Sequence, residues 1–270
     1  KEWQTGKIIH YFDKNNLRNV QIRLRGDNPG NWIREKQSFR IKLRKSEMHE
    51  RQRYYNYLPF EIRHLTSTRM ALNSKILAPK VTPIELLING EKKGLYLEIE
   101  NFNENFLRRN KIMPVNFYKG ENFNQETKIG LPRYLFSNSG LWSKEANFNF
   151  YEKENKNDIK KFLKILNNSK NDPKKFQILQ SYLDEEYIGR YLAYINLVQN
   201  YHETRFHNNR LIIDTWKGQI YPVITDPGQN FNSNTSFDNV TNDLSSILHQ
   251  SSKFINLKYY YLDKLLFKRK

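Results

Sequence analysis

Three polar side chains stand out because their types and spacing suit a metal ion. Asn208 and Asn209 precede one apolar run, and Asp226 opens a Pro-Gly turn after a second apolar run. The three therefore flank a predicted hairpin. An amide and a carboxylate that meet across a hairpin form an oxygen-rich site suited to Mg²⁺. The alternative is ordinary turn chemistry, because Asp and Asn are common in turns.

A long amphipathic helix is predicted just before these residues, over residues 184–198. Asp184 is the expected N-cap, and Glu185 and Glu186 lie in the first turn, where the helix dipole favours acidic groups. Apolar side chains recur at helical spacing and should pack into the core. They are Tyr187, Ile188, Tyr191, Leu192, Ile195 and Val198. The helix carries residues 200–205, which are mostly polar, into a loop.

Two basic strands are predicted near the start of the chain. Residues 20–25 and 38–44 alternate apolar and basic side chains, and residues 26–31 between them are rich in turn formers. Cationic side chains and loop N–H groups that converge there would form a phosphate cradle. A solvated basic face of a sheet explains the same pattern, and periodicity does not separate the two interpretations.

The remaining pattern predicts a mixed fold without repeats or a separating linker. Asn89-Gly90 between two apolar runs predicts a hairpin of residues 83–88 and 94–99, which residues 91–93 could lengthen. A strand is expected at 7–12 with its turn at 13–16, and residues 113–150 are expected to be loops with a few strands. Helices are expected at 66–77, from Asn103 to 107, and at 158–166, 174–182 and 257–267. The polar run 232–252 is predicted to be a loop or lid.

Composition points to an anionic partner. The 270 residues carry a formal net charge of +17, which favours nucleic acid, a phosphorylated ligand or an acidic surface. An AT-rich genome that favours Lys and Asn codons explains the charge equally well. Cysteine is absent, so disulfides and thiolate chemistry are excluded, and zinc is not expected. No apolar run approaches membrane-spanning length. The chain starts at Lys1 rather than Met, as it would if an upstream segment had been removed.

Four blocks, in order, resemble the CotH family, named after spore coat protein H. They are IRLRGDNPGNW with KQSFRIKL (22–32 and 36–43), IELLINGEKKGLYLEIENFNENFL (84–107), YLDEEYIGRYLAYINLVQNYHE (182–203), and the Asn pair with its hairpin and Asp226. Each block is weak alone, but together they are fairly specific. The resemblance implies an α+β, two-lobed protein-kinase-like fold. Its N-terminal lobe, about residues 1–100, would be a mostly antiparallel sheet, and its C-terminal lobe, about 101–270, would be helical, both in one domain.

The resemblance also implies ATP- and Mg²⁺- or Mn²⁺-dependent transfer of phosphate to Ser or Thr of a protein. Asp226 would bind metal, with Asn208 or Asn209 on a second metal. The residues expected at the phosphates are Arg23, Arg25, Arg40 and Lys42, of which Lys42 is the first choice for the nucleotide lysine. Residues 98–101, with Glu98 and Glu100, would lie near the adenine. The implied acceptors are basic, Ser-rich coat proteins, which a basic kinase would repel at long range.

The sequence departs from the family at the catalytic base. Where the family has an Asp soon after the main helix, this chain has Glu203, with His202 as the other candidate base. Thr225 replaces the family's Trp, and Gly228 replaces a second acidic or amide residue. Two alternatives follow: a catalytically weak or inactive member that binds nucleotide or partner as a surface or coat scaffold, and, ranked last for lack of a motif, a nucleic-acid-binding protein.

Overall fold

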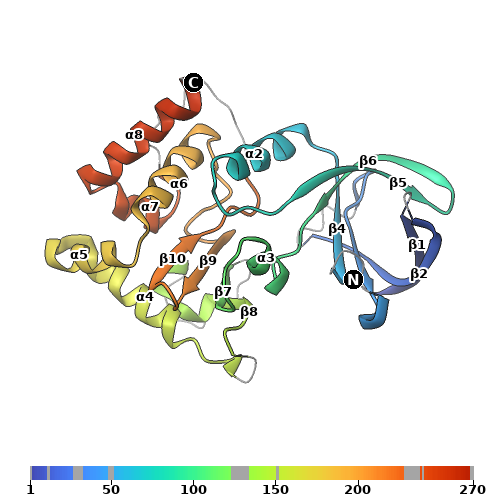
Figure 1. Ribbon diagram of the computed structural model, residues 1–270, viewed down its shortest axis with the longest axis horizontal. Helices are drawn as coiled ribbons and strands as arrows, with labels where there is room; N and C mark the ends of the chain where they lie inside the picture. The colour runs from blue at the N-terminus through green and yellow to red at the C-terminus, as the bar shows by residue number, and fades with distance from the viewer. Residues whose placement is uncertain are drawn as a thin grey trace. The chain divides into compact units, whose positions relative to one another are not determined.

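A computed structural model of the chain describes residues 2–10, 13–26, 33–47, 52–122, 134–149, 152–227, 238 and 240–267. The chain divides into two compact units. Unit 1 is Lys1–Leu65 with Pro79–Phe106, and unit 2 is Thr66–Ala78 with Leu107–Lys270. The fold is mixed α/β, with antiparallel sheets and helices (Figure 1). In the part of the chain that the structure describes, no helix combines the length and apolar character needed to cross a membrane.

Unit 1 is built on a six-stranded antiparallel sheet in the order β1-β2-β3-β4-β6-β5. The strands are β1 (Gln4–His10), β2 (Asp13–Leu24), β3 (Phe39–Leu43), β4 (Tyr54–Pro59), β5 (Val81–Ile88) and β6 (Glu91–Ile99). Val20 lies opposite Leu43, and Ile22 lies opposite Ile41. These side chains belong to one hydrophobic cluster. The predicted alternation is therefore confirmed, and Arg23, Arg40 and Lys42 lie on the other face.

Three details of unit 1 test the sequence pattern. The turn predicted at 13–16 is wrong, because the ladder pairs His10 with Asp13 and β2 already begins there. The Asn89-Gly90 turn is confirmed as a two-residue turn, since both have positive φ and Ile88 pairs directly with Glu91. The structure adds β4, which lies between β3 and β6. Tyr55, Asn56 and Tyr57 are all buried there, so the strand lacks the alternation that marks a half-exposed one.

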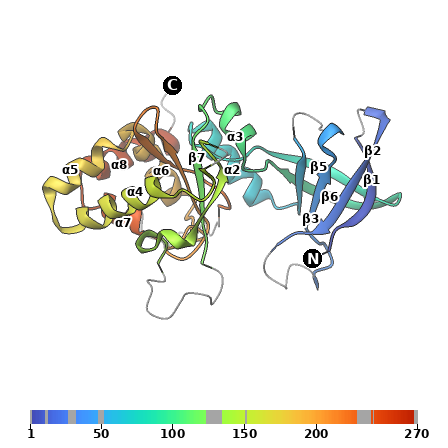
Figure 2. The ribbon, with the colours of Figure 1, turned by 90° about the horizontal axis from the view of Figure 1, so that it is seen from below.

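Unit 2 combines a four-stranded antiparallel sheet, in the order β10-β9-β7-β8, with helices. Figure 2 shows α4, α5, α6 and α8 on one side of β7. The strands are β7 (Asn116–Gly120), β8 (Trp142–Ala146), β9 (Asn209–Asp214) and β10 (Gln219–Pro222). The helices are α4 (Asn157–Asn168), α5 (Pro173–Ser181), α6 (Glu185–Leu197), α7 (Asp243–Leu248) and α8 (Ser252–Phe267), and α2 (Ile62–Asn73) and α3 (Glu104–Arg109) cross the boundary between the units.

Two helix caps predicted from sequence, Asp184 and Asn103, are confirmed. Asp184 accepts a hydrogen bond from the Tyr187 N–H at 2.9 Å, and Asn103 accepts one from the Asn105 N–H at 2.9 Å. The apolar side chains predicted for the core of α6 are all buried. A loop throughout 232–252 is wrong, because α7 forms within it with Asn242 as its N-cap. Leu244, Ile247 and Leu248 are buried, and their helical spacing explains why a short helix forms here.

Candidate functional site

The polar loop after α6 is closed by its own hydrogen bonds. Gln199 has a positive φ, and the Asn200 N–H donates to the Ile195 carbonyl, which ends the helix. Farther on, the Asn209 amide donates to the carbonyls of Thr204 at 2.6 Å and His207 at 2.9 Å. The segment between α6 and β9 is therefore short, and hydrogen bonds within it hold its side chains in place.

The hairpin of β9 and β10 brings the Asn pair to the stretch before Asp226. The Val223 N–H donates to the Arg210 carbonyl at 3.0 Å, and the Thr225 hydroxyl donates to the Asn208 carbonyl at 3.2 Å. The predicted hairpin therefore forms and brings Thr225, the residue before Asp226, against Asn208, whereas the meeting of the Asn amides with the Asp226 carboxylate stays a prediction. Asp226 follows at once, with its carboxylate Oδ2 3.4 Å from His202 Nδ1. His202 and Asp226 are each about half exposed, so this corner of unit 2 is open to solvent.

Glu203 lies beneath this corner as a buried carboxylate, only 3% exposed. The Tyr191 hydroxyl donates to its Oε2 at 2.6 Å, and Oε1 is buried with no hydrogen bond within the described part of the chain. Burial raises the pKa of Glu203 to about 7; Tyr191, Asn200 and Arg210 oppose this, while the charge of Asp226 adds to it. A carboxyl that titrates near neutral pH is suited to accept a proton.

The donor set fits a hard divalent cation. Both amide hydrogens of Asn209 are used within the loop, which leaves its Oδ1 for a ligand, and Asp226 offers a half-exposed carboxylate. Asn208 has a φ of 60°, in the left-handed region that Asn tolerates. No group of three or more His, Asp or Glu residues in the described ranges could hold a metal alone. A cation here would therefore take other oxygen ligands, such as amides or phosphate.

The basic candidates of unit 1 separate into different environments. Arg23 and Arg40 lie opposite each other on β2 and β3, and the Arg40 Nε donates to Asn56 Oδ1 at 2.8 Å. The Arg23 guanidinium lies 4.6 Å, and the Lys42 ammonium 5.5 Å, from the centroid of the Trp3 ring. The sequence pattern does not mark Trp3, because it precedes the first strand. Arg25 is held at the end of β2 by its N–H, which donates to the Ser38 carbonyl at 2.7 Å.

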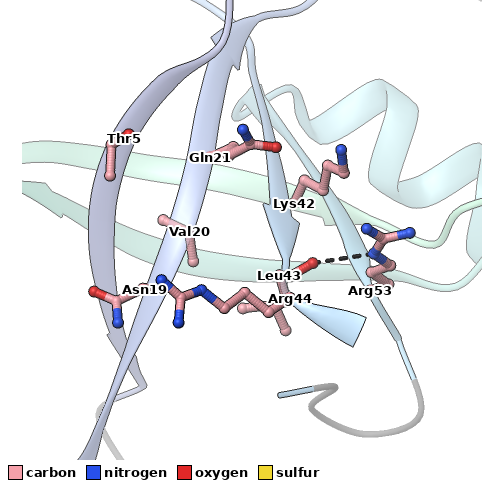
Figure 3. Close-up of a pocket in the computed structure, with 8 residues that line it drawn as sticks. All are labelled: Thr5, Asn19, Val20, Gln21, Lys42, Leu43, Arg44 and Arg53. Atoms are coloured by element: carbon pink, nitrogen blue, oxygen red, sulfur yellow. Dashed lines mark hydrogen bonds between the residues drawn. The ribbon is translucent and has the colours of Figure 1, made fainter. Parts of the chain in front are cut away.

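Lys42 also lines a pocket of about 270 Å³ on unit 1 (Figure 3). The pocket is lined by Thr5, Asn19, Val20, Gln21, Lys42, Leu43, Arg44 and Arg53, so three cations and no acid surround it among the residues that the structure describes. Arg44 extends toward Asn19, and the Arg53 Nε donates to the Leu43 carbonyl at 3.1 Å. Arg44 continues the alternation of β3, whereas Arg53 precedes β4 and no sequence pattern pointed to it.

The two acidic candidates of unit 1 have partners within the unit. Glu100 accepts a hydrogen bond from the Lys80 N–H at 2.9 Å. Glu98 pairs with Tyr57 across β4 and β6, and burial followed by the Glu98 carboxylate raises the pKa of Tyr57. Both carboxylates are thus tied to the strands that lead into residues 99–101, and their predicted place near an adenine stays a prediction.

Comparison with known families gives one match. The sequence profile of the family described as CotH kinase protein matches residues 22–236, which is most of the chain and includes every candidate residue discussed above. No curated protein matches the chain.

Proposed function

Since the chain belongs to the CotH kinase protein family, we propose that it transfers the γ-phosphoryl group of ATP to a Ser or Thr of a partner protein, with Mg²⁺ or Mn²⁺. The observation that carries this proposal is the grouping of Glu203, His202 and Asp226 beside the Asn pair. Base candidates and oxygen ligands for a cation occur there within one small part of unit 2.

Each residue of this corner of unit 2 has its own role in the proposed phosphate transfer. Asp226 and the Asn209 amide oxygen hold the cation, with Asn208 as the alternative amide. When bound, the cation neutralises charge on the transferring phosphate. Glu203 accepts the proton of the acceptor hydroxyl, because its pKa of about 7 lets it do so near neutral pH. His202 is the second candidate base, since its ring is exposed where Glu203 is buried.

Unit 1 supplies the nucleotide contacts in this proposal. Lys42, with Arg44 and Arg53 around the same pocket, binds phosphate oxygens, and Arg23, Arg25 and Arg40 add positive charge along β2 and β3. Glu98 and Glu100 mark the stretch that meets the adenine. Units 1 and 2 then correspond to the two lobes of an atypical protein-kinase-like fold.

One observation favours a second candidate function, that of a binding scaffold without transfer. Glu203 Oε1 is buried, so an acceptor hydroxyl cannot reach it in the structure as it stands. Catalytic hydrogen bonds often tighten only when substrate is bound, which keeps Glu203 a candidate base. A member that binds ATP but transfers nothing would retain the pocket of unit 1 and the cation ligands of unit 2.

Labelled ATP tests these proposals directly. The purified protein would be incubated with Mg²⁺ or Mn²⁺ and a generic acceptor protein, beside Asp226→Asn, Glu203→Gln and His202→Ala. Asp263→Asn and Glu186→Gln, both exposed, serve as matched controls. We expect label in the wild type and controls and none in Asp226→Asn. Loss of label in Glu203→Gln assigns the role of the base to Glu203. Loss of label in His202→Ala, with label retained in Glu203→Gln, assigns that role to His202.

Two outcomes would contradict the kinase. No label in the wild type, with ATP still raising its melting temperature, supports the binding scaffold. If the wild type shows neither label nor a thermal shift with ATP, then ATP is excluded as its ligand. Steeply salt-dependent binding of DNA or RNA in that case would support the nucleic-acid alternative.

A further inference from the structure

The polar loop is held by a buried tyrosine of α6. The Tyr191 hydroxyl donates to Glu203 Oε2 at 2.6 Å, and Tyr191 is only 1% exposed. One carboxylate oxygen of Glu203 is thus tied, through a single hydroxyl, to the helix that precedes the loop. Asn242 caps α7, because its Oδ1 accepts from the Ser245 N–H at 2.9 Å.

A second connection lies two residues along the loop. Arg205 donates to the Asp243 carboxylate at 2.7 Å, and the Asp243 side chain is only 6% exposed. The Arg205 guanidinium also lies 4.3 Å from the centroid of the Tyr134 ring, and its carbonyl accepts from the Leu135 N–H. Such a partly buried, charge-assisted hydrogen bond is among the stronger links available to a loop. Glu203 is therefore held by α6 through Tyr191, and Arg205 is held by the start of α7 through Asp243.

We propose that Tyr191 and Asp243 are positioning residues for the loop of residues 199–208. Tyr191 occupies one oxygen of Glu203, so that the other oxygen is the one left to take a proton. Asp243 binds the Arg205 side chain two residues after Glu203. This contact fixes the position of the loop backbone that carries the Glu203 carboxylate. This inference rests on the proposed function for its effect on transfer, but the hydrogen bond to Glu203 can be tested without it.

Other groups also lie close enough to act on Glu203. They are Tyr187 and Tyr194 of α6, Asn200 of the loop, Arg210 of β9, and Asp226 after β10. Tyr191→Phe removes only a hydroxyl. Tyr194→Phe is the matched control, because it removes a buried hydroxyl from the same helix that donates to the Ser67 carbonyl at 2.9 Å.

The first measurement is the titration of Glu203 in the protein without ATP, followed by carboxyl NMR of isotope-labelled glutamate and assigned with Glu203→Gln. Tyr191 donates to the charged form, so its removal should raise the pKa of Glu203 by about one unit. Tyr194→Phe should leave it unchanged. Equal shifts in both variants, or none in Tyr191→Phe, would overturn the role of Tyr191.

The second measurement is the rate of transfer against pH and ATP concentration. In Tyr191→Phe the alkaline plateau should be reached about one pH unit later. Asp243→Asn should lower kcat about tenfold with KM for ATP unchanged, because misplacing a base affects chemistry rather than nucleotide binding. Asp263→Asn is its control. An Asp243→Asn enzyme with unchanged kcat would overturn that half of the proposal. If the wild type transfers nothing, the proposed function fails, whereas the titration still decides the role of Tyr191.

Discussion

At the scale of single residues, Glu203 is the side chain whose chemistry depends most on the fold. Sequence alone marks it as the nearest carboxylate after α6, but no pattern in the sequence shows that it is 3% exposed beneath Tyr191. Burial disfavours the charged form, which is why its pKa rises to about 7. A group that titrates at neutral pH must also make folding depend on pH.

Replacing Glu203 should therefore stabilise the protein at alkaline pH. The folded pKa lies above the ordinary value of 4.5, so Glu203 favours folding most fully below about pH 4.5 and loses that contribution as pH rises through about 7. Glu203→Gln removes this loss. Relative to wild type, its free energy of unfolding should rise by about 3 kcal/mol, as an upper bound, between about pH 4 and about pH 8.

Urea unfolding of both proteins at the two pH values measures this difference. Glu186→Gln on α6, where the Glu186 side chain is 75% exposed, should show almost no pH-dependent change relative to wild type. A Glu203→Gln effect that is the same at both pH values would mean that the carboxyl titrates normally in the folded protein. Stabilisation together with lost transfer would fit a residue kept for activity at the expense of stability.

At the scale of elements, α6 and α8 pack closely because Gly189 leaves space between them. A Cβ built on Gly189 would lie 2.8 Å from the Leu257 Cβ and 3.0 Å from the Tyr261 ring. The tight contact is with a side-chain carbon attached directly to the backbone of α8, which cannot rotate away. A helix-interior glycine normally costs about 1 kcal/mol relative to alanine, so here the packing has to outweigh propensity.

Gly189→Ala should consequently destabilise the protein rather than stabilise it. Overpacking at a rigid contact costs about 1–3 kcal/mol, more than the gain in helix propensity. Glu186→Ala, one turn earlier and exposed, is the control and should be close to neutral. Thermal and urea unfolding of the two variants give the comparison. A Gly189→Ala protein as stable as wild type would show that α8 can shift without cost.

The elements also show what sequence can and cannot give. Alternation in β2 and β3, the Asn89-Gly90 turn and the caps Asp184 and Asn103 are local signals, and the structure has each of them. β4 was not predicted, because a central strand buries both faces and loses its alternation. The partners of the candidate residues were not predictable either. The sequence marks Tyr191 only as a core residue, and Arg53 comes next to Lys42 only because β3 pairs with β4.

At the scale of the whole molecule, the net charge of +17 acts on a macromolecular partner at longer range than any single contact. Long-range attraction raises the rate of encounter with acidic partners and lowers it with basic ones. The pocket of unit 1 is part of this field, with three cations in its lining. If the protein is a kinase, its acceptor should therefore carry acidic residues around the Ser or Thr.

Peptides of matched length test this preference for an acidic acceptor. With one Ser flanked by acidic, neutral or basic residues, kcat/KM should be highest for the acidic peptide at low ionic strength. It should fall about tenfold as salt rises from about 0.01 M to about 0.15 M, because screening shortens the reach of the field from about 30 Å to about 8 Å. For the neutral peptide, kcat/KM should change little with salt.

Charge reversal at Arg44, Arg44→Glu, tests whether the pocket itself guides the acceptor, in which case the preference for the acidic peptide should fall. An unchanged preference would assign the steering to the charge spread over the whole surface. A basic peptide that is the best substrate at every salt concentration would show that local contacts at the acceptor outweigh the net charge.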